Sequence, residues 1–267
     1  MSISKNYKQS EAFLNMQKRG QVTIFVIVAL LIVGAIIIYL AFPKTRAIFP
    51  GASLPNPNSY LSDCLSPIIT SNMKTLSEQG GYLKPDNPAL YKGNKIEYLC
   101  YTSENYKPCI VQQPLLVSKF ESELKKSIQP KASSCISELK NLYEQKEYKF
   151  TSSDSINVTV DTGSVRVEYI TPITISKDTT QTFRRAGLVK SSNMYDLLMT
   201  ATSIVQFEST LGNSETSLYI QYYPDLNIEK MKRQDDTIYT LTNVVSKESF
   251  RFATRSLIFP AGFGGLG

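Results

Sequence analysis

The sequence predicts an α+β fold behind a single N-terminal hydrophobic helix, and three observations indicate this class. Residues 22–42 form an apolar run that no charge interrupts. Between residues 59 and 147, which hold all four cysteines, apolar side chains recur at helical spacing. From residue 148 to residue 267, short alternating segments separated by turn residues indicate β-strands with one further helix. We therefore expect a disulfide-bearing helical subdomain at 59–147, followed at 148–267 by an antiparallel β-sheet subdomain with one packed helix.

The composition argues against several classes of function. The chain has 267 residues, of which 42% are hydrophobic, enough to bury a core. Half of its net charge of +6 lies in the first 20 residues, and the remainder is spread thinly, so no basic cluster predicts a nucleic-acid partner. Histidine is absent, which removes the commonest general base and zinc ligand. With no Ser-Lys motif or phosphate-binding loop either, we expect no enzyme, no cofactor and no metal site.

The apolar run at 22–42 predicts a membrane-spanning helix. Its length corresponds to about 31 Å, close to the hydrocarbon thickness of a bilayer. Only Thr23 and Gly34 interrupt its strongly apolar character. Lys18 and Arg19 abut its start with further lysines behind them, and this excess over the far side places the N-terminus in the cytoplasm. The C-terminal domain is then extracellular, at the cell surface.

The junction before this run carries a second signal. Lys18, Arg19 and Gly20 directly precede Gln21 and the hydrophobic stretch. This pattern resembles the class III signal peptide of archaeal type IV pilins and related surface filaments. The resemblance covers about 25 residues. It implies that residues 1–20 are a leader, and that a prepilin peptidase-like membrane protease cuts between Gly20 and Gln21. Residues 21–42 would then remain as the transmembrane and assembly helix.

Two features depart from that family. Many pilins have Glu at the fifth mature position, where this chain has Phe25. In most pilins the first helix also continues into the head, whereas the segment at 43–58 is a Pro-rich linker with four prolines. The resemblance therefore implies processing more directly than assembly.

Two functions from different classes follow. The first is a type IV pilin-like surface protein, structural or adhesive, whose partners are the membrane and, by self-assembly, copies of itself or other pilin-like subunits; Gly34 would allow close helix approach. The alternative is a monomeric, membrane-tethered extracellular binding module with an uncleaved signal anchor. A tethered enzyme is a third class, but no catalytic constellation is visible to support it.

In the helical subdomain, apolar spacing predicts a helix over 61–76, kinked or started by Pro67 and stopped by Gly80 and Gly81. Residues 95–101 predict a short strand. Pro114 opens a second helical pattern over 116–128, and after Pro130 a third covers 135–143.

In the β-rich subdomain, Asp161-Thr162-Gly163 predicts a hairpin turn between strands at 156–160 and 164–176. A helix with an apolar face over 197–205 follows, capped by Ser192 or Asn193. The alternation after it predicts three strands, at 217–223, 237–243 and 249–258.

The four cysteines, Cys64, Cys100, Cys109 and Cys135, predict two disulfides in an extracellular domain. Three pairings are open. Cys64 and Cys135 lie on apolar helical stripes, and Cys100 and Cys109 flank one polar loop, which favours 64–135 with 100–109. Their spacing lacks CxxC and does not fit zinc.

Four shorter motifs remain. Asn157 heads the one N-glycosylation triplet. Residues 79–82 (QGGY), after a Cys-bearing helix, make the outer domain similar to uncharacterised archaeal surface proteins, which implies no activity. Residues 262–267 match GxGxxG only formally, since no helix follows; we expect an apolar tail or a docking peptide for a neighbouring subunit. Asp235 and Asp236 read as a solvated turn.

Overall fold

The computed structural model describes residues 25–34 and 54–258. The chain divides into two units, Met1–Ser53 and Leu54–Gly267. In the first, residues 25–34 are helical and expose apolar side chains such as Phe25 and Leu31. Within the described ranges, no helix combines the length and the apolar character needed to cross a membrane. The leader at 1–20, the rest of the span at 21–42 and the linker up to residue 53 lie outside those ranges.

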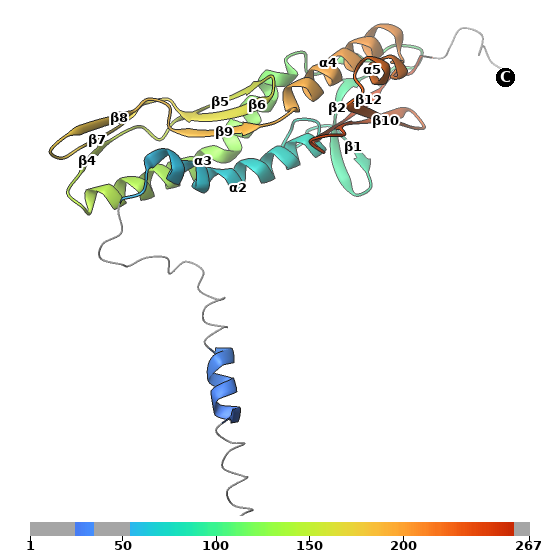
Figure 1. Cartoon of the computed structure of the whole chain (residues 1–267). Helices are drawn as coiled ribbons and strands as arrows, with labels where there is room; N and C mark the ends of the chain where they lie inside the picture. Colours follow the sequence, from blue (N-terminus) through green and yellow to red (C-terminus); the bar gives the residue numbers. More distant parts are fainter. Residues whose placement is uncertain (1–24, 35–53, 259–267) are drawn as a thin grey trace, which may run out of the picture. The chain divides into compact units, whose positions relative to one another are not determined.

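The second unit is built along two antiparallel helices (Figure 1). These are α2 (Pro57–Glu78) and α3 (Leu116–Glu144). Asn56 caps α2, because its side-chain oxygen accepts from the backbone N–H groups of Asn58 and Ser59 at 3.0 and 3.4 Å. The facing apolar stripes are fully buried and include Leu65 in α2 and Phe120 in α3.

Pro130 does not divide α3. The sequence predicted separate helices at 116–128 and 135–143, but one helix runs through this proline, as α2 runs through Pro67. Both prolines lie on the exposed sides of their helices, where the ring meets solvent rather than a packed neighbour. The buried stripe is continuous on either side of each proline, so tertiary packing outweighs the missing backbone hydrogen bond.

A three-stranded sheet of order β5-β6-β9 covers the helix pair. Its strands are β5 (Ile156–Asp161), β6 (Ser164–Tyr169) and β9 (Gly187–Ser191). β5 and β6 form the predicted hairpin, and Gly163 has a φ of 78° in its turn. The buried Tyr169 hydroxyl donates to the carbonyl of Ala132 in α3 at 2.7 Å and ties sheet to helix.

A second three-stranded sheet, of order β4-β7-β8, lies at the end of the unit where α3 finishes and α2 begins (Figure 1). The single strand predicted at 164–176 is therefore two strands in different sheets. The chain leaves β6 after Tyr169 and starts β7 at Ile173. The strands of this sheet are β4 (Lys149–Thr151), β7 (Ile173–Ser176) and β8 (Thr180–Phe183).

A six-stranded sheet closes the opposite end, with the order β1-β2-β12-β11-β10 and β3 beside β2. It is mixed rather than purely antiparallel as predicted, because β2 and β12 pair in parallel. β2 comes from the predicted helical part and β12 from the β-rich part, so the two parts share one sheet. The strands are β1 (Pro88–Tyr91), β2 (Asn94–Tyr101), β3 (Ile110–Val111), β10 (Leu226–Arg233), β11 (Asp236–Asn243) and β12 (Ser249–Arg255).

Two further helices lie at this end. α4 (Met194–Leu211) packs on β12 and is the helix predicted around 197–205. α5 (Ser217–Tyr222) corrects the strand predicted at 217–223. Polar and apolar residues alternate in that segment, but none of the six residues of α5 is buried, so the alternation does not correspond to a core-facing side. Periodicity alone therefore gave the wrong element there.

The structure contains the favoured disulfides. Cys64 and Cys135 join α2 to α3, with Cα atoms 6.2 Å apart, and Cys100 and Cys109 close the loop after β2, with Cα atoms 5.3 Å apart. The described residues hold no free cysteine.

The QGGY segment at 79–82 is a structural junction. Gly80 and Gly81 have φ values of 75° and 88° and end α2. A Cβ on Gly80 would lie 3.1 Å from the Cβ of Glu97, so β2 also requires glycine there. Tyr82 donates to the side chain of Gln113 at 3.1 Å and lies under the ammonium of Lys119.

We predict that removing the two disulfides has unequal effects. The cysteines of the first pair are 71 residues apart in sequence, and those of the second are 9 apart. Loop-closure entropy then predicts losses of about 4 and about 3 kcal/mol in the free energy of unfolding. Paired Cys→Ala variants, unfolded in urea and followed by circular dichroism because the chain lacks Trp, measure this. A larger loss from the Cys100/Cys109 variant would contradict the prediction.

We predict that Pro130→Ala stabilises the protein. The exposed ring makes no core contact, and alanine restores a helical N–H donor, so the free energy of unfolding should rise by about 1–3 kcal/mol. Pro114→Ala is the control, because Pro114 is also exposed but precedes α3, where no helical hydrogen bond is missing. Equal effects of the two substitutions in urea unfolding would refute the explanation.

Candidate functional site

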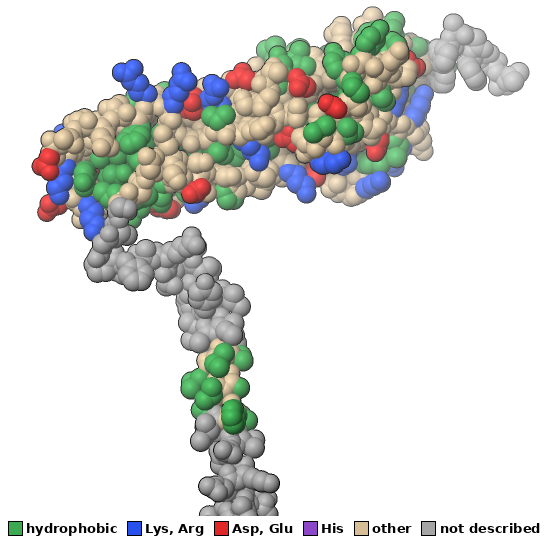
Figure 2. Space-filling view, viewed as in Figure 1, with side chains coloured by type: hydrophobic (Ala, Val, Ile, Leu, Met, Phe, Trp, Pro, Cys, Tyr) green, Lys and Arg blue, Asp and Glu red, His purple; other side chains and the backbone are tan. Residues whose placement is uncertain are grey.

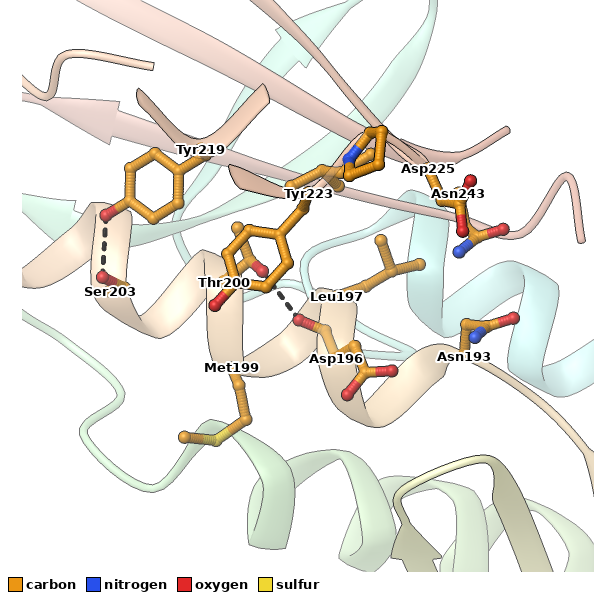
Figure 3. A pocket seen from close by; sticks show the side chains of 12 residues that line it. Asn193, Asp196, Leu197, Met199, Thr200, Ser203, Tyr219, Tyr223, Asp225 and Asn243 are labelled. Carbon is orange, nitrogen blue, oxygen red and sulfur yellow. Dashed lines mark hydrogen bonds between the residues drawn. The ribbon is translucent and has the colours of Figure 1, made fainter. Parts of the chain in front are cut away.

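A cavity of about 500 Å³ opens between α4, α5 and the strands that follow (Figure 3). We call it the polar pocket. Its walls combine the outer side of α4, the end of α5, the start of β10 and the end of β11. The lining residues are Asn193, Asp196, Leu197, Met199, Thr200, Ser203, Tyr219, Tyr223, Pro224, Asp225, Leu226 and Asn243.

The amphipathic pattern of α4 positions one wall. Leu197, Leu198 and Ala201 face the core and are almost fully buried. The opposite stripe carries Asp196 and Thr200, one turn apart, toward the cavity (Figure 3). Since the inner stripe is fixed by burial, the outer polar stripe is fixed with it.

The start of α4 is held from outside the helix. Asn193 occupies the N-cap position, but its side chain makes no capping hydrogen bond. Instead the Ser192 hydroxyl accepts from the N–H of Met194 at 3.1 Å and donates to the Glu248 carboxylate at 2.7 Å. Glu248 also accepts from the Asn193 N–H, so a carboxylate lies at the positive end of the helix. The Asn193 side chain is left to line the pocket.

Two tyrosines from the α5 region form the aromatic wall. The Tyr219 hydroxyl lies 2.7 Å from the hydroxyl of Ser203 and joins α5 to α4 (Figure 3). Tyr223 ends α5, its N–H donating to the carbonyl of Tyr219 at 2.9 Å, and its ring is 60% exposed. This ring offers an accessible apolar face beside the polar stripe.

The charged groups of the pocket are carboxylates. In the described part of the chain, the carboxylates of Asp196 and Asp225 have no hydrogen-bond or ion-pair partner, and no Lys or Arg lines the cavity. The side-chain oxygen of Asn243 accepts from the N–H groups of Val245 and Ser246 at 3.0 and 2.8 Å, which leaves its amino group. The arrangement can bind a ligand that brings hydroxyl or amine donors, and it disfavours phosphate.

A buried polar cluster lies under the end of α4. The Glu208 carboxylate is 2% exposed and accepts from the Tyr239 hydroxyl and from the N–H of Ser214, the latter at 3.2 Å. Lys230 donates to the carbonyl of Ser214 at 2.7 Å and to the side chain of Asn213. These bonds hold the loop between α4 and α5, and with it the aromatic wall of the pocket.

Burial shifts the pKa values of two groups in this cluster, Tyr239 and Lys230. It raises the pKa of Tyr239, and the charge of Glu208 raises it further, so the phenol remains a donor. Burial lowers the pKa of Lys230, against the carboxylates of Glu208 and Glu215, which act in the opposite direction. Neither group lines the polar pocket, so their role is to position the loop.

The structure brings only part of the predicted site residues together. Lys18, Arg19, Gly20 and Gln21 lie outside the described residues. Asn157 is exposed on β5, where its side-chain amide donates to Thr159 at 3.4 Å, and it is not part of the polar pocket. The possible cap Asn193 does line the pocket. The other lining residues were missed, although the polar spacing of Asp196, Thr200 and Ser203 on a predicted helix was the available signal.

The paired carboxylates between β10 and β11 do not form a metal site. Asp235 and Asp236 pair with the Arg255 guanidinium at 3.1 and 4.0 Å. Across residues 25–34 and 54–258, no group of three or more His, Cys, Asp or Glu side chains could hold a metal ion.

Comparison with protein-family models, with curated proteins and with solved structures found no match to this chain.

We predict that Tyr239→Phe lowers the free energy of unfolding by about 1–3 kcal/mol, because it leaves the buried Glu208 carboxylate one donor short. The matched control is Tyr222→Phe, which removes the same hydroxyl from a ring that is 75% exposed and should change little. Urea unfolding at pH 7 measures both.

The pH dependence gives a second readout of the same bond. Because folding raises the pKa of Tyr239, the bond contributes fully below the unfolded tyrosine pKa of about 10 and is lost as the pH rises through the folded pKa. Above about pH 10, the free energy of unfolding of the wild type should therefore fall more steeply than that of Tyr239→Phe. Parallel losses would show that another group dominates.

Proposed function

We propose that this chain is a type IV pilin-like cell-surface protein with a structural or adhesive role, anchored or assembled through its N-terminal hydrophobic helix. The adhesive role is supported by the position of the polar pocket within the compact unit. Leu54, where this unit joins the N-terminal segment, is at the start of α2, and the pocket belongs to the sheet at the other end of that helix (Figure 1). The 22 residues of α2 separate the two by about 33 Å.

The disulfides support an extracellular domain. Such bonds persist in oxidising surroundings and are rare in the cytosol, where thiols are kept reduced. Both cysteine pairs of the chain are bridged. Together with the positive charges before residue 22, this favours a cytoplasmic N-terminus and an exposed C-terminal domain at the cell surface.

The chemistry of the polar pocket favours contact with a donor-rich surface. Two carboxylates that have no partner among the described residues, and the exposed ring of Tyr223, suit a partner that presents hydroxyl or amine groups. Within the compact unit, the end opposite Leu54 is where an adhesive protein would make that contact.

The alternative is a monomeric, membrane-tethered binding module with an uncleaved anchor. Phe25, in place of the usual Glu, and the prolines of the linker favour it. Both functions use the same pocket and differ in processing and assembly. Electron microscopy of material sheared from cells separates them, since a filament that contains this chain supports only the first.

We predict that the mature protein begins at Gln21. N-terminal sequencing of the membrane fraction should find this residue first, and Gly20→Leu should leave the chain about 20 residues longer, because a bulky side chain blocks the backbone at the cut. Gly34→Leu is the matched control, as it makes the same change inside the hydrophobic run. A wild-type chain that still begins at Met1 would contradict the pilin-like proposal and leave the tethered module.

A further inference from the structure

The α4–α5 region carries an apolar surface beside the polar pocket. We define the apolar patch as Phe207 and Leu211 of α4 with Leu218 and Tyr222 of α5. Their exposed fractions are 47%, 61%, 55% and 75%. Figure 2 shows hydrophobic side chains gathered over these helices at the upper right. A contiguous exposed apolar surface of this kind is typical of an interaction site.

Two grooves flank the α4 part of the patch. One, of about 350 Å³, lies toward α5 and includes Leu218 and Tyr222, and the other, of about 430 Å³, lies on the far side and includes Met199. Phe207 and Leu211 line both grooves. A segment that packs over Phe207 and Leu211 would contact apolar side chains in both grooves.

The C-terminal segment starts at the edge of the patch. Gly212 ends α4 with a φ of 72°, immediately after Leu211. Ile258 packs so closely on Gly212 that a Cβ there would lie 2.5 Å from the Ile258 side chain. The chain therefore passes the C-terminal end of α4 just before residues 259–267.

The composition of residues 259–267 suits the patch. The sequence FPAGFGGLG has no charged residue, and it supplies Phe259, Phe263 and Leu266 as apolar side chains. Nine extended residues reach about 30 Å, and the 18 residues of α4 span about 27 Å, so the segment can follow the whole helix. Its glycines allow the backbone to approach a surface closely.

We propose that residues 259–267 bind in cis to the apolar patch of the same chain and cover Phe207 and Leu211. The tether begins next to the binding surface, so the effective concentration is on the order of millimolar, above that of a second copy in solution. Binding to a second copy would instead give a swapped dimer or a head-to-tail assembly, both of which place the segment and the patch on different chains. The covered patch borders the polar pocket through Ser203, Tyr219 and Tyr223.

Photo-crosslinking of the full chain in detergent tests this proposal. Phe263 is replaced by the photoreactive analogue p-benzoylphenylalanine, and unlabelled and ¹⁵N-labelled protein are mixed in equal amounts before irradiation. Mass spectrometry of the digest should find crosslinks from residue 263 to the segments at 207–211 or 218–222, with both peptides of each pair carrying the same isotope.

Matched variants complete the experiment. Phe207→Ser removes an apolar contact from the exposed patch and should lower the crosslink yield by about tenfold. Ile170→Ser changes a side chain of similar exposure, 60%, in the loop between β6 and β7, and should leave the yield unchanged. Mixed-isotope crosslinks would overturn the proposal in favour of exchange between copies. Crosslinks to other segments, no crosslinks, or a yield insensitive to Phe207→Ser would also overturn it.

Discussion

The antiparallel packing of α2 against α3 is the constraint on which the rest of the domain depends. The buried stripes of the two helices form one continuous apolar seam, and the Cys64–Cys135 bridge fixes their register covalently. The β5-β6-β9 sheet is laid on this pair and tied to it by the Tyr169 hydroxyl. The six-stranded sheet begins where α2 ends, at the Gly80–Gly81 turn. Removing the seam would leave the sheets without a common core.

The polar pocket is a consequence of how the second half of the chain returns to the first. β12 pairs with β2 in parallel and packs on α4, which also contacts α3; α5 contacts β10 and is joined to α4 by the Ser203–Tyr219 hydrogen bond. Three of the lining residues also have a structural role. Leu197 belongs to the core, Tyr219 joins two helices, and Asn243 organises a turn. A surface formed in this way can vary its outer polar residues without loss of the fold.

Polar and apolar surfaces meet along a single helix. The first half of the outer side of α4 carries Asp196 and Thr200, and the second half carries Phe207 and Leu211. The buried Glu208 cluster holds the loop that connects this helix to α5, so both surfaces share one support. An acceptor-rich cavity with an apolar border can combine directional hydrogen bonds with contact area, as binding pockets commonly do.

The sequence by itself determined the α+β class, the helical and strand periods of the core elements and the hairpin at Gly163, because each depends on local spacing. It favoured the observed pairing of the cysteines among three alternatives, and the structure decided it. It also predicts an anchor at 22–42, of which residues 25–34 are described, and a processing signal at Lys18–Gln21, which lies outside the described part of the chain. Only the tertiary structure decided the continuity of α3 through Pro130, the helical state of residues 217–222, the parallel β2–β12 pair and the polar pocket. These depend on burial against partners far away in sequence, and a local pattern does not encode which side of an element another segment will cover.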